Sequence, residues 1–358
     1  MIIKYGLDYE LSQYWSETSS QWINSWKTEY TYNTNGYPTQ EIDYGWYEGQ
    51  WFYDLKMDYI YDNNGDQIQT ILIDIPAWGG LMKFENTYDI NGNLTLVTGY
   101  GWDGNQWLLS SKIESTYDTN GDQIQYIIYG WKPVISQWSY VRKTEYTYDN
   151  NRNLTQFIEF SWDGSQWWYD WKTEYTYDNN GNLTQNVDYS FYNPMANWLN
   201  ESKTEYTYDN NRNLTQYIDY SWVGAQWVNE WKTNFTYNDL YSYSDLVLPY
   251  YSTIPDFYRT FESKIFFNHM LTNGMGYIWD SDLNDWAIKD SYTFSYSEKD
   301  ILSTSEIIEQ KLKIYPNPVS NVLTIKSEIN PIDKVEIYSV LGKKIKEINF
   351  DFENINTG

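Results

Sequence analysis

A tyrosine-rich motif recurs along this chain at nearly constant intervals, and this repetition limits the folds that are open to it. The last residue of a Tyr-x-Tyr-Asp pattern stands at eight positions that lie 27 to 31 residues apart: Asn33, Asp62, Asp89, Asp118, Asp149, Asp178, Asp209 and Asn238. Two eroded copies continue the series at 266–268 and 294–297. Repeats of this length are supersecondary units that bury their apolar surface against neighbouring copies. The sequence therefore predicts about ten such units over 1–297, with a period of about 29 residues.

The stretch from Trp171 to Leu183, WKTEYTYDNNGNL, shows what one unit contains. Its aromatic residues fall on alternate positions with Lys172 and Glu174 between them, which predicts a strand with one buried and one solvated face. The Asn-Gly pair before Leu183 tolerates the positive φ of a tight hairpin turn. Each unit is expected to be an antiparallel β-hairpin with an aromatic face and a polar face. On the polar face, Lys172 and Glu174 are expected to meet opposite charges on neighbouring strands.

Each unit has two turns of different kinds. The first turn reads Asp-x-Asn-Gly, and because Arg152 and Arg212 replace the glycine in two copies, a left-handed conformation is not expected to be required there. The second turn is bracketed by tryptophans. Since the hairpins follow one another in sequence, all second turns should line one edge of the sheet. That edge would carry a row of tryptophans, in which Trp46 pairs with Trp51, Trp102 with Trp107, Trp162 with Trp167, and Trp222 with Trp227.

The fold class predicted for this chain is all-β. An open sheet of roughly twenty strands would accumulate twist, so the hairpins should form a meander that coils into a superhelix or rolls until its aromatic faces meet. The segment 248–258 interrupts the repeats and is interpreted as an enlarged second turn. Residues 298–310 are mostly polar and are interpreted as a linker. Trp then disappears and Lys, Ile and Val increase, which predicts a second, smaller domain over 311–358.

Charge and composition exclude several classes of function. The net charge of −25 disfavours nucleic acid and anionic membranes as partners, because their phosphates would be repelled. No run of apolar residues is long enough for a membrane-spanning helix. The chain has no cysteine, and 20 Trp and 39 Tyr must supply much of the packing. The first residues lack the pattern of a signal peptide and begin within the repeats, so we expect the sequence to be a fragment at this end.

Catalytic and metal-binding residues are not expected in this chain. His269 is the only histidine and there is no cysteine, which leaves almost nothing for nucleophilic catalysis or for a zinc site. The many carboxylates recur from repeat to repeat, whereas an active site occurs once. The Asp-x-Asn-Gly turns are shorter than a calcium-binding EF-hand loop, so they are interpreted as structural turns with calcium as the alternative. We therefore predict a protein that is not an enzyme and has no cofactor.

The C-terminal part of the chain resembles the type IX secretion C-terminal sorting domain. The resemblance is carried by Tyr315-Pro316-Asn317-Pro318, by the strand 322–325, and by Tyr338 with Leu341-Gly342-Lys343. It implies a small β-sandwich, export across a Gram-negative outer membrane by the type IX machinery, and release or attachment at the cell surface. The family's domain ends in a Gly-x-Tyr strand that would begin at Gly358, so the resemblance implies an incomplete sandwich.

The repeats resemble the YD repeats of RHS-type proteins, whose pattern is Tyr-x-Tyr-Asp-x-x-Gly-x-Leu. Tyr175, Tyr177, Asp178, Gly181 and Leu183 match this pattern in full. The period departs from the family because of the added tryptophan-bracketed turn. The sequence contains neither an RHS core motif nor a C-terminal toxin segment, so a closed shell that carries a toxin is not expected.

The tryptophan row is the best candidate for a functional site. Exposed rings suit stacking on sugar faces, and repetition would add avidity, so we expect adhesion or glycan binding by an extracellular or surface protein. One alternative is a purely structural scaffold in which each pair of tryptophans clamps its own hairpin. Another is a secreted hydrolase with its site in the irregular region 240–290.

Overall fold

The computed structural model describes residues 2–74, 80–192, 195–249 and 267–301, together with five short strands near the C-terminus. The chain divides into two compact units, of which the larger contains Ile3–Lys299 and the smaller contains Met1–Ile2 and Asp300–Gly358. The repeats form the larger unit.

Long strands joined by turns make up this unit, as alternating aromatic, β-branched and polar residues favour. The first nine are β1 (Ile2–Ser16), β2 (Gln21–Tyr32), β3 (Pro38–Tyr47), β4 (Gln50–Tyr61), β5 (Gln67–Asp74), β6 (Leu81–Tyr88), β7 (Leu94–Trp102), β8 (Trp107–Tyr117) and β9 (Gln123–Lys132). They are followed by β10 (Gln137–Tyr148), β11 (Leu154–Trp162), β12 (Trp167–Tyr177), β13 (Leu183–Tyr192), β14 (Asn197–Tyr208), β15 (Leu214–Val223), β16 (Gln226–Ser242), η2 (Tyr243–Asp245), β17 (Leu246–Val247), β18 (His269–Asp280) and β19 (Asp285–Ile301).

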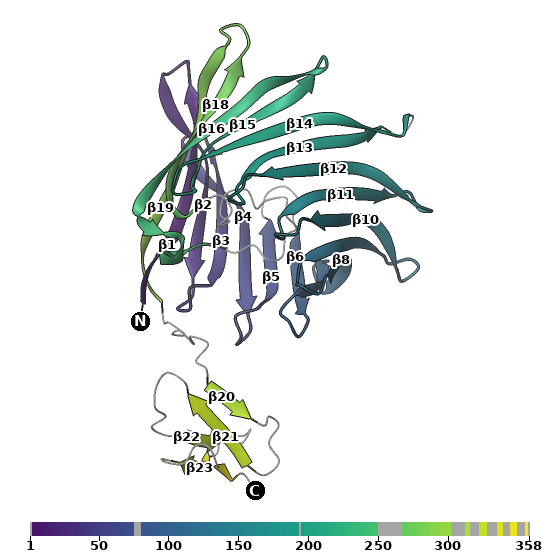
Figure 1. The fold of residues 1–358 in the computed structure, drawn as a ribbon, viewed down its shortest axis with the longest axis vertical. Coiled ribbons are helices and arrows are strands. Elements are labelled where there is room, and N and C mark those ends of the chain that lie inside the picture. The colour runs from purple at the N-terminus through teal and green to yellow at the C-terminus, as the bar shows by residue number, and fades with distance from the viewer. Residues whose placement is uncertain are drawn as a thin grey trace. The chain divides into compact units, whose positions relative to one another are not determined.

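The strands form an antiparallel meander that closes on itself, so β1 pairs with both β2 and β19 (Figure 1). The sheet has nineteen strands, and the two-residue β17 pairs in parallel with β1, which leaves eighteen in the ring. The predicted hairpin meander is therefore confirmed. The two predicted arrangements, a superhelix or a rolled sheet with meeting faces, are wrong, because pairing of the two end strands removes both free edges.

Seven first turns share one pattern of backbone hydrogen bonds, and Asp178 illustrates it; they begin at Asn33, Asp62, Asp89, Asp118, Asp149, Asp178 and Asp209. Its Oδ1 accepts from the backbone N–H groups of Asn180 and Asn182 at 2.8 and 2.9 Å, and its Oδ2 accepts from the Asn182 side chain at 2.8 Å. Gly181 has a φ of 79°. Arg152 and Arg212 occupy the equivalent position with φ of 67° and 64°, so the left-handed conformation is retained and the expectation that it is not required was wrong.

One β-bulge in each of several strand pairs changes which side chains share a face. Tyr177 pairs with Leu183 while Thr176 pairs with Gln185, so the residue between them, Thr184, is bulged. Its Oγ1 donates to the Thr176 carbonyl at 3.0 Å. The bulge reverses the alternation after Leu183. Both faces of the sheet consequently carry aromatic residues, and the predicted division into an aromatic and a polar face is wrong.

The two faces are named here by the residues that mark them. The tyrosine face carries Thr173 and Tyr175 of β12, and the lysine face carries Lys172 and Glu174 of the same strand. The tyrosine face contains buried threonines in equivalent positions, among them Thr144, Thr173 and Thr233 at 1 to 2% exposure. It also contains the apolar cluster of Leu214, Phe235 and Leu271.

An inserted segment lies between β16 and β18, and it occupies the position of a first turn. Asn238 of β16 pairs with Met270 of β18, so β16 and β18 are the two strands that flank this first-turn position. The interpretation of 248–258 as an enlarged second turn is therefore wrong; 250–258 itself lies outside the described residues. Leu246 and Val247 of the insert pair with Tyr5 and Gly6 of β1.

The smaller unit contains the strands β20 (Leu312–Tyr315), β21 (Val322–Ser327), β22 (Val335–Tyr338), β23 (Lys344–Ile348) and β24 (Ile355–Asn356). They form one three-stranded and one two-stranded sheet. That these sheets form a sandwich stays a prediction. The linker expected at 298–310 begins inside β19, which continues to Ile301, and 302–310 lies outside the described residues.

Candidate functional site

The second turns share one edge of the closed sheet, which we call the second-turn rim. The predicted tryptophans lie there as directly opposed cross-strand pairs with ring centroids 4.8 to 5.2 Å apart: Trp46 with Trp51, Trp102 with Trp107, Trp162 with Trp167, and Trp222 with Trp227. Their planes meet at 62° to 67°, an edge-to-face arrangement that stabilises aromatic pairs. All eight rings are half-buried except that of Trp102, which is 38% exposed.

Sequence reasoning missed four further pairs of the same kind. These have centroids 5.0 to 5.3 Å apart and consist of Trp15 with Trp22, Trp131 with Trp138, Phe191 with Trp198, and Trp279 with Trp286. They were missed because six residues separate the two rings instead of four. A search for aromatic residues separated by either four or six residues would have found them.

At seven of these eight aromatic pairs, a lysine on the lysine face of the preceding strand lies over rings of both strands of the pair. Lys83 illustrates the contact, because its Nζ lies 4.4 Å from the ring centroid of Tyr100 and 5.4 Å from that of Trp107. It also forms an ion pair with Glu85 at 2.7 Å on its own strand, two residues away, rather than with a neighbouring strand as predicted. The Tyr100 hydroxyl donates to Glu85 at 3.0 Å. Hydrogen bonds from Lys83 and Tyr100 hold the pKa of Glu85 below its ordinary value.

This contact recurs around the sheet. Equivalent lysines lie over an aromatic ring of the next strand and over the second ring of the aromatic pair, one strand further on: Lys27, Lys112, Lys143, Lys172, Lys203 and Lys232. Cation–π contacts of this kind stabilise neighbouring elements when partly desolvated. One ring of each such pair therefore has a structural role between hairpins.

Trp51 and Trp227 show how this contact changes the expected row of exposed rings. The ring centroid of Trp51 lies 5.3 Å from Lys27 Nζ, and that of Trp227 lies 5.6 Å from Lys203 Nζ. Each of these rings also packs against the other tryptophan of its pair. Both rings are consequently half-buried. That Trp51 and Trp227 stack on a sugar stays a prediction.

The segments between the two rings of a pair, strand ends included, expose apolar side chains at the second-turn rim. Tyr47 is 64% exposed, Met195 74%, Val223 57% and Leu283 74%. Val134 and Ile135 extend the same feature in the turn between β9 and β10. Repeated exposed apolar side chains along one edge are typical of a contact surface.

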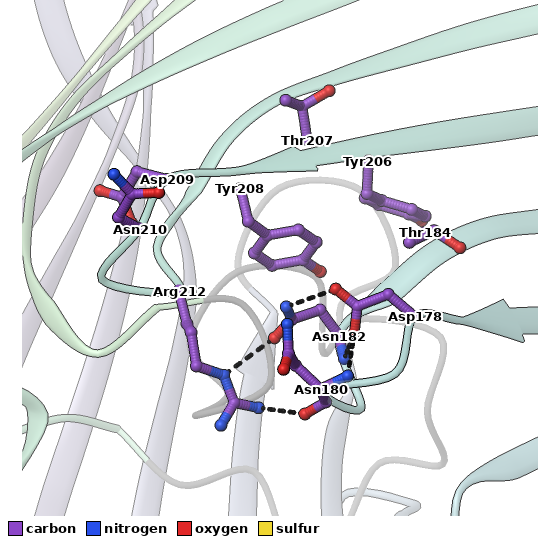
Figure 2. A pocket seen from close by; sticks show the side chains of 10 residues that line it. All are labelled: Asp178, Asn180, Asn182, Thr184, Tyr206, Thr207, Tyr208, Asp209, Asn210 and Arg212. Atoms are coloured by element: carbon purple, nitrogen blue, oxygen red, sulfur yellow. Dashed lines mark hydrogen bonds between the residues drawn. The ribbon is translucent and has the colours of Figure 1, made fainter.

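The opposite edge, the first-turn rim, contains a polar pocket of about 420 Å³. It lies between the β12–β13 and β14–β15 turns, and Figure 2 shows the ten side chains that line it. Arg212 reaches across it from one turn to the other. Its Nε donates to Asn182 Oδ1 at 3.0 Å and its Nη2 donates to the Asn180 carbonyl at 2.9 Å (Figure 2).

Several carboxylates on the tyrosine face lie near the second-turn rim and are hard to ionise. Burial, opposed by a hydrogen bond from Thr204, raises the pKa of Asp219 to about 6, with a further contribution from Glu230. Burial also raises the pKa values of Asp43 and Glu159. Shifts of this kind occur at functional sites and in buried structural positions alike.

His269 and the acidic turns have structural partners. Asn213 lies 3.1 to 3.2 Å from His269 Nδ1, and its Oδ1 accepts from the backbone N–H groups of 268 and 269. The turn carboxylates accept backbone N–H groups of their own loops, which holds the pKa of Asp118 below its ordinary value. Within the described part of the chain, no group of three or more His, Cys, Asp or Glu side chains is arranged to hold a metal ion. The region 240–290 is described only outside 250–266.

Comparison with solved structures finds similarities of low identity. A protein of unknown function from Bacteroides fragilis NCTC 9343 is 18% identical over 34% of this chain and 89% of that one, with a TM-score of 0.30. A porin-like protein from Bacteroides uniformis ATCC 8492 is 12% identical over 81% of this chain and 98% of that one, with a TM-score of 0.31. The Photorhabdus luminescens Tc holotoxin pore is 12% identical over 96% of this chain and 17% of that one, with a TM-score of 0.29. No curated protein matches the chain.

The described residues contain no helix with the length and apolarity needed to cross a membrane. The resemblance of the repeats to YD repeats stays a prediction. For the C-terminal region the comparison is direct, because residues 313–358 match the secretion system C-terminal sorting domain, as predicted from the Tyr-Pro-Asn-Pro motif at 315–318. Such a domain directs a protein out of the cell, so the chain is that of a secreted or cell-surface protein that carries the type IX sorting signal.

Proposed function

We propose that this protein is a non-catalytic adhesion or glycan-binding protein whose second-turn rim is the contact surface. The observation that carries the proposal is the concentration of aromatic pairs and exposed apolar side chains on one edge of a closed sheet. A secreted or cell-surface protein meets extracellular glycans and surface polymers, and many equivalent contacts on one edge would add avidity to weak individual ones.

Two kinds of residue would share this task. The tryptophan pairs give each hairpin a fixed end, since they lie edge to face and one ring lies beneath a lysine. The exposed residues beyond them, such as Tyr47 and Val223, would supply the contact with the partner. Trp102, the most exposed ring of the predicted set, would contribute directly.

A structural scaffold is the second candidate, and a specific observation favours it. An ion pair, a hydrogen bond and two ring contacts join three consecutive strands, β6 to β8, through Lys83, Glu85, Tyr100 and Trp107. This arrangement would be needed for stability whether or not the rim binds anything. Among the described residues of 240–290, outside 250–266, no comparable contact supports a secreted hydrolase.

The experiment compares binding by variants that change only exposed side chains. A triple variant Tyr47→Ser, Met195→Ser, Val223→Ser removes apolar surface at the second-turn rim. The matched control is Ile90→Ser with Leu240→Ser, which makes the same chemical change at the first-turn rim, where both side chains are more than 80% exposed. Retention on immobilised polysaccharides, and emission shifts of the tryptophans with acrylamide quenching, would be measured.

Weaker binding by the triple variant alone would support the proposal. Tryptophans that are protected from acrylamide and respond to no glycan would leave the scaffold as the function. Equal loss in both variants would indicate a general effect of surface polarity and would also contradict a specific rim.

A further inference from the structure

Two residues that line the pocket on the first-turn rim make different hydrogen bonds from the equivalent residues of other repeats. The first is Tyr208, whose hydroxyl is buried and has no hydrogen-bond partner. In the hairpins on either side, the equivalent tyrosine donates to a backbone carbonyl of the preceding hairpin. Tyr177 donates to Leu154 at 2.9 Å and Tyr237 donates to Leu214 at 2.6 Å. A buried donor without a partner is costly, and Tyr208 is one of the residues that line the pocket.

The second difference is the partner of Arg212. The equivalent Arg152 forms a bidentate ion pair with Asp122, at 2.8 and 2.6 Å, and donates to the Asn120 carbonyl at 3.0 Å. Asn182 stands where Asp122 would be, so Arg212 donates to a neutral amide oxygen. The guanidinium of Arg212 is therefore held across the pocket without a direct carboxylate contact (Figure 2).

We propose that this Arg212 pocket binds a neutral saccharide. Its volume of about 420 Å³ falls within the range of small-molecule sites. The charged side chains of the lining are the carboxylates of Asp178 and Asp209 and the guanidinium of Arg212. Their net negative charge disfavours binding of an anion, and the positive guanidinium disfavours binding of a metal ion. Sugar hydroxyls both donate and accept, so they match a lining of carboxylates, amides, hydroxyls and one guanidinium. The Tyr208 hydroxyl and Arg212 would donate to the sugar.

This site is independent of the second-turn rim, since it lies at the opposite ends of the strands. Its test uses the full chain and saturation-transfer difference NMR, followed by titration calorimetry, with maltose, cellobiose, lactose and mannobiose as probes. Galacturonic acid and calcium chloride serve as an anionic and a cationic probe. Binding of at least one neutral disaccharide is expected.

Two variants test the residues, and the repeats supply a matched control. Arg212→Gly restores the glycine found in the other first turns, so folding is retained while the guanidinium is removed. Tyr208→Phe removes only the hydroxyl. Each is expected to weaken binding about tenfold. Arg152→Gly makes the same change two repeats earlier and should leave the affinity for the saccharide unchanged.

Three results would overturn the proposal. The first is an absence of binding by every neutral disaccharide at millimolar concentration. The second is equal affinity of the wild-type chain and Arg212→Gly, which would place the sugar elsewhere. The third is binding of galacturonic acid or calcium in preference to all neutral sugars, which would assign the pocket to an ion. Melting temperatures of all variants confirm that each remains folded.

Discussion

Asp8 and Lys299 lie 291 residues apart in the sequence and form an ion pair of 2.6 Å across the line where the sheet closes. Asp8 also accepts from Ser297 at 2.9 Å, and the Tyr5 hydroxyl donates to Glu298 at 3.1 Å. Gly6 leaves the space that the Lys299 stem fills, because a Cβ at Gly6 would lie 2.7 Å from Lys299 Cε. The first and last strands of the repeat unit are thus joined by side chains as well as by strand pairing.

Replacement of Lys299 by alanine should loosen this closure. The ion pair is partly screened by solvent, so we expect a loss of about 1 kcal/mol in the free energy of unfolding. Amide hydrogen exchange should become faster in β1 and β19 than in β11–β13. The exposed Lys289 on β19 provides the control, because Lys289→Ala leaves these contacts in place. Unchanged exchange in β1 of Lys299→Ala would contradict the prediction.

Seven lysines lie over rings of both following strands, and six of them form an ion pair with a glutamate two residues later on the same strand. At the seventh, Lys232, this position is occupied by Asn234. Lys232 lies 4.5 and 4.6 Å from the ring centroids of Tyr277 and Trp286, and burial lowers its pKa. Asn234→Glu should add the ion pair found elsewhere and stabilise the protein by a few tenths of a kcal/mol to about 1 kcal/mol. Thermal denaturation measures the gain.

The reverse exchange, Glu205→Asn, is the matched control. It removes the 2.6 Å ion pair with Lys203 and the 2.9 Å hydrogen bond from Tyr220, so it should destabilise by about 1 kcal/mol. If both substitutions shift the melting temperature in the same direction, the carboxylate does not have the role assigned to it.

Asp219 should contribute more to the stability of the folded state at acidic than at neutral pH. Its pKa is raised to about 6 by burial, so the folded state binds this proton more tightly than the unfolded state. Stability from this group is therefore complete below pH ~4 and decreases as the pH rises towards ~6. Asp219→Asn keeps an acceptor for Thr204 and should stabilise by about 1 kcal/mol or more at pH 7, with no gain near pH 4.

Asp149→Asn tests whether the effect is specific to Asp219. Hydrogen bonds from Asn153 and neighbouring backbone groups hold the pKa of Asp149 below its ordinary value, so its ionised form favours folding. Denaturation at pH 4 and pH 7 should show no gain for this variant at neutral pH. A gain equal to that of Asp219→Asn would remove the explanation based on burial.

Alanine substitutions at Gly65 and Gly92 distinguish the cost of a strained backbone from the cost of a steric clash. Both have a positive φ, 91° and 83°, so alanine costs about 1 kcal/mol at either position. At Gly65 a Cβ would also lie 2.3 Å from the Tyr37 hydroxyl, whereas at Gly92 no atom lies within 4 Å. Gly65→Ala should therefore destabilise more than Gly92→Ala in denaturant titrations. Equal losses would show that Tyr37 moves aside without cost.

The repeat pattern predicted the hairpins, both turn types and the edge on which the tryptophans lie. It did not predict which side chains share a face of the sheet, because the bulge at Thr184 reverses the alternation. In the sequence this bulge is marked only by a threonine after Leu183, which is not distinctive by itself. Lys172 was expected to form an ion pair with a neighbouring strand, but its partner Glu174 is on the same strand. The lysine side chain instead extends over the rings of Tyr189 and Trp198 on the two following strands.

The burial of individual tryptophans was not predictable from the pairs themselves. Trp51 and Trp227 each follow their turn, and each lies beneath a lysine from two strands earlier, Lys27 and Lys203. The spacing within one turn carries no information about that lysine, so the two rings of a pair looked equivalent in the sequence.

Closure and the pocket could not be predicted for a different reason. Both depend on contacts between residues that no local pattern connects, such as Asp8 with Lys299 and Arg212 with the turn 30 residues before it. The arginine in the motif was visible in the sequence. Its left-handed backbone and its reach to the preceding turn were not, because they depend on how neighbouring turns stack.

Closure also has a consequence for how such a chain can change during evolution. An open row of repeats can lengthen or shorten by one copy with little effect on the copies that remain. In a ring, duplication or loss of one hairpin alters the circumference, and every inter-hairpin angle must adjust before the first and last strands meet again. Copy number is therefore constrained by curvature, and variation should accumulate in the loops and in the insert after β16 rather than in the number of units.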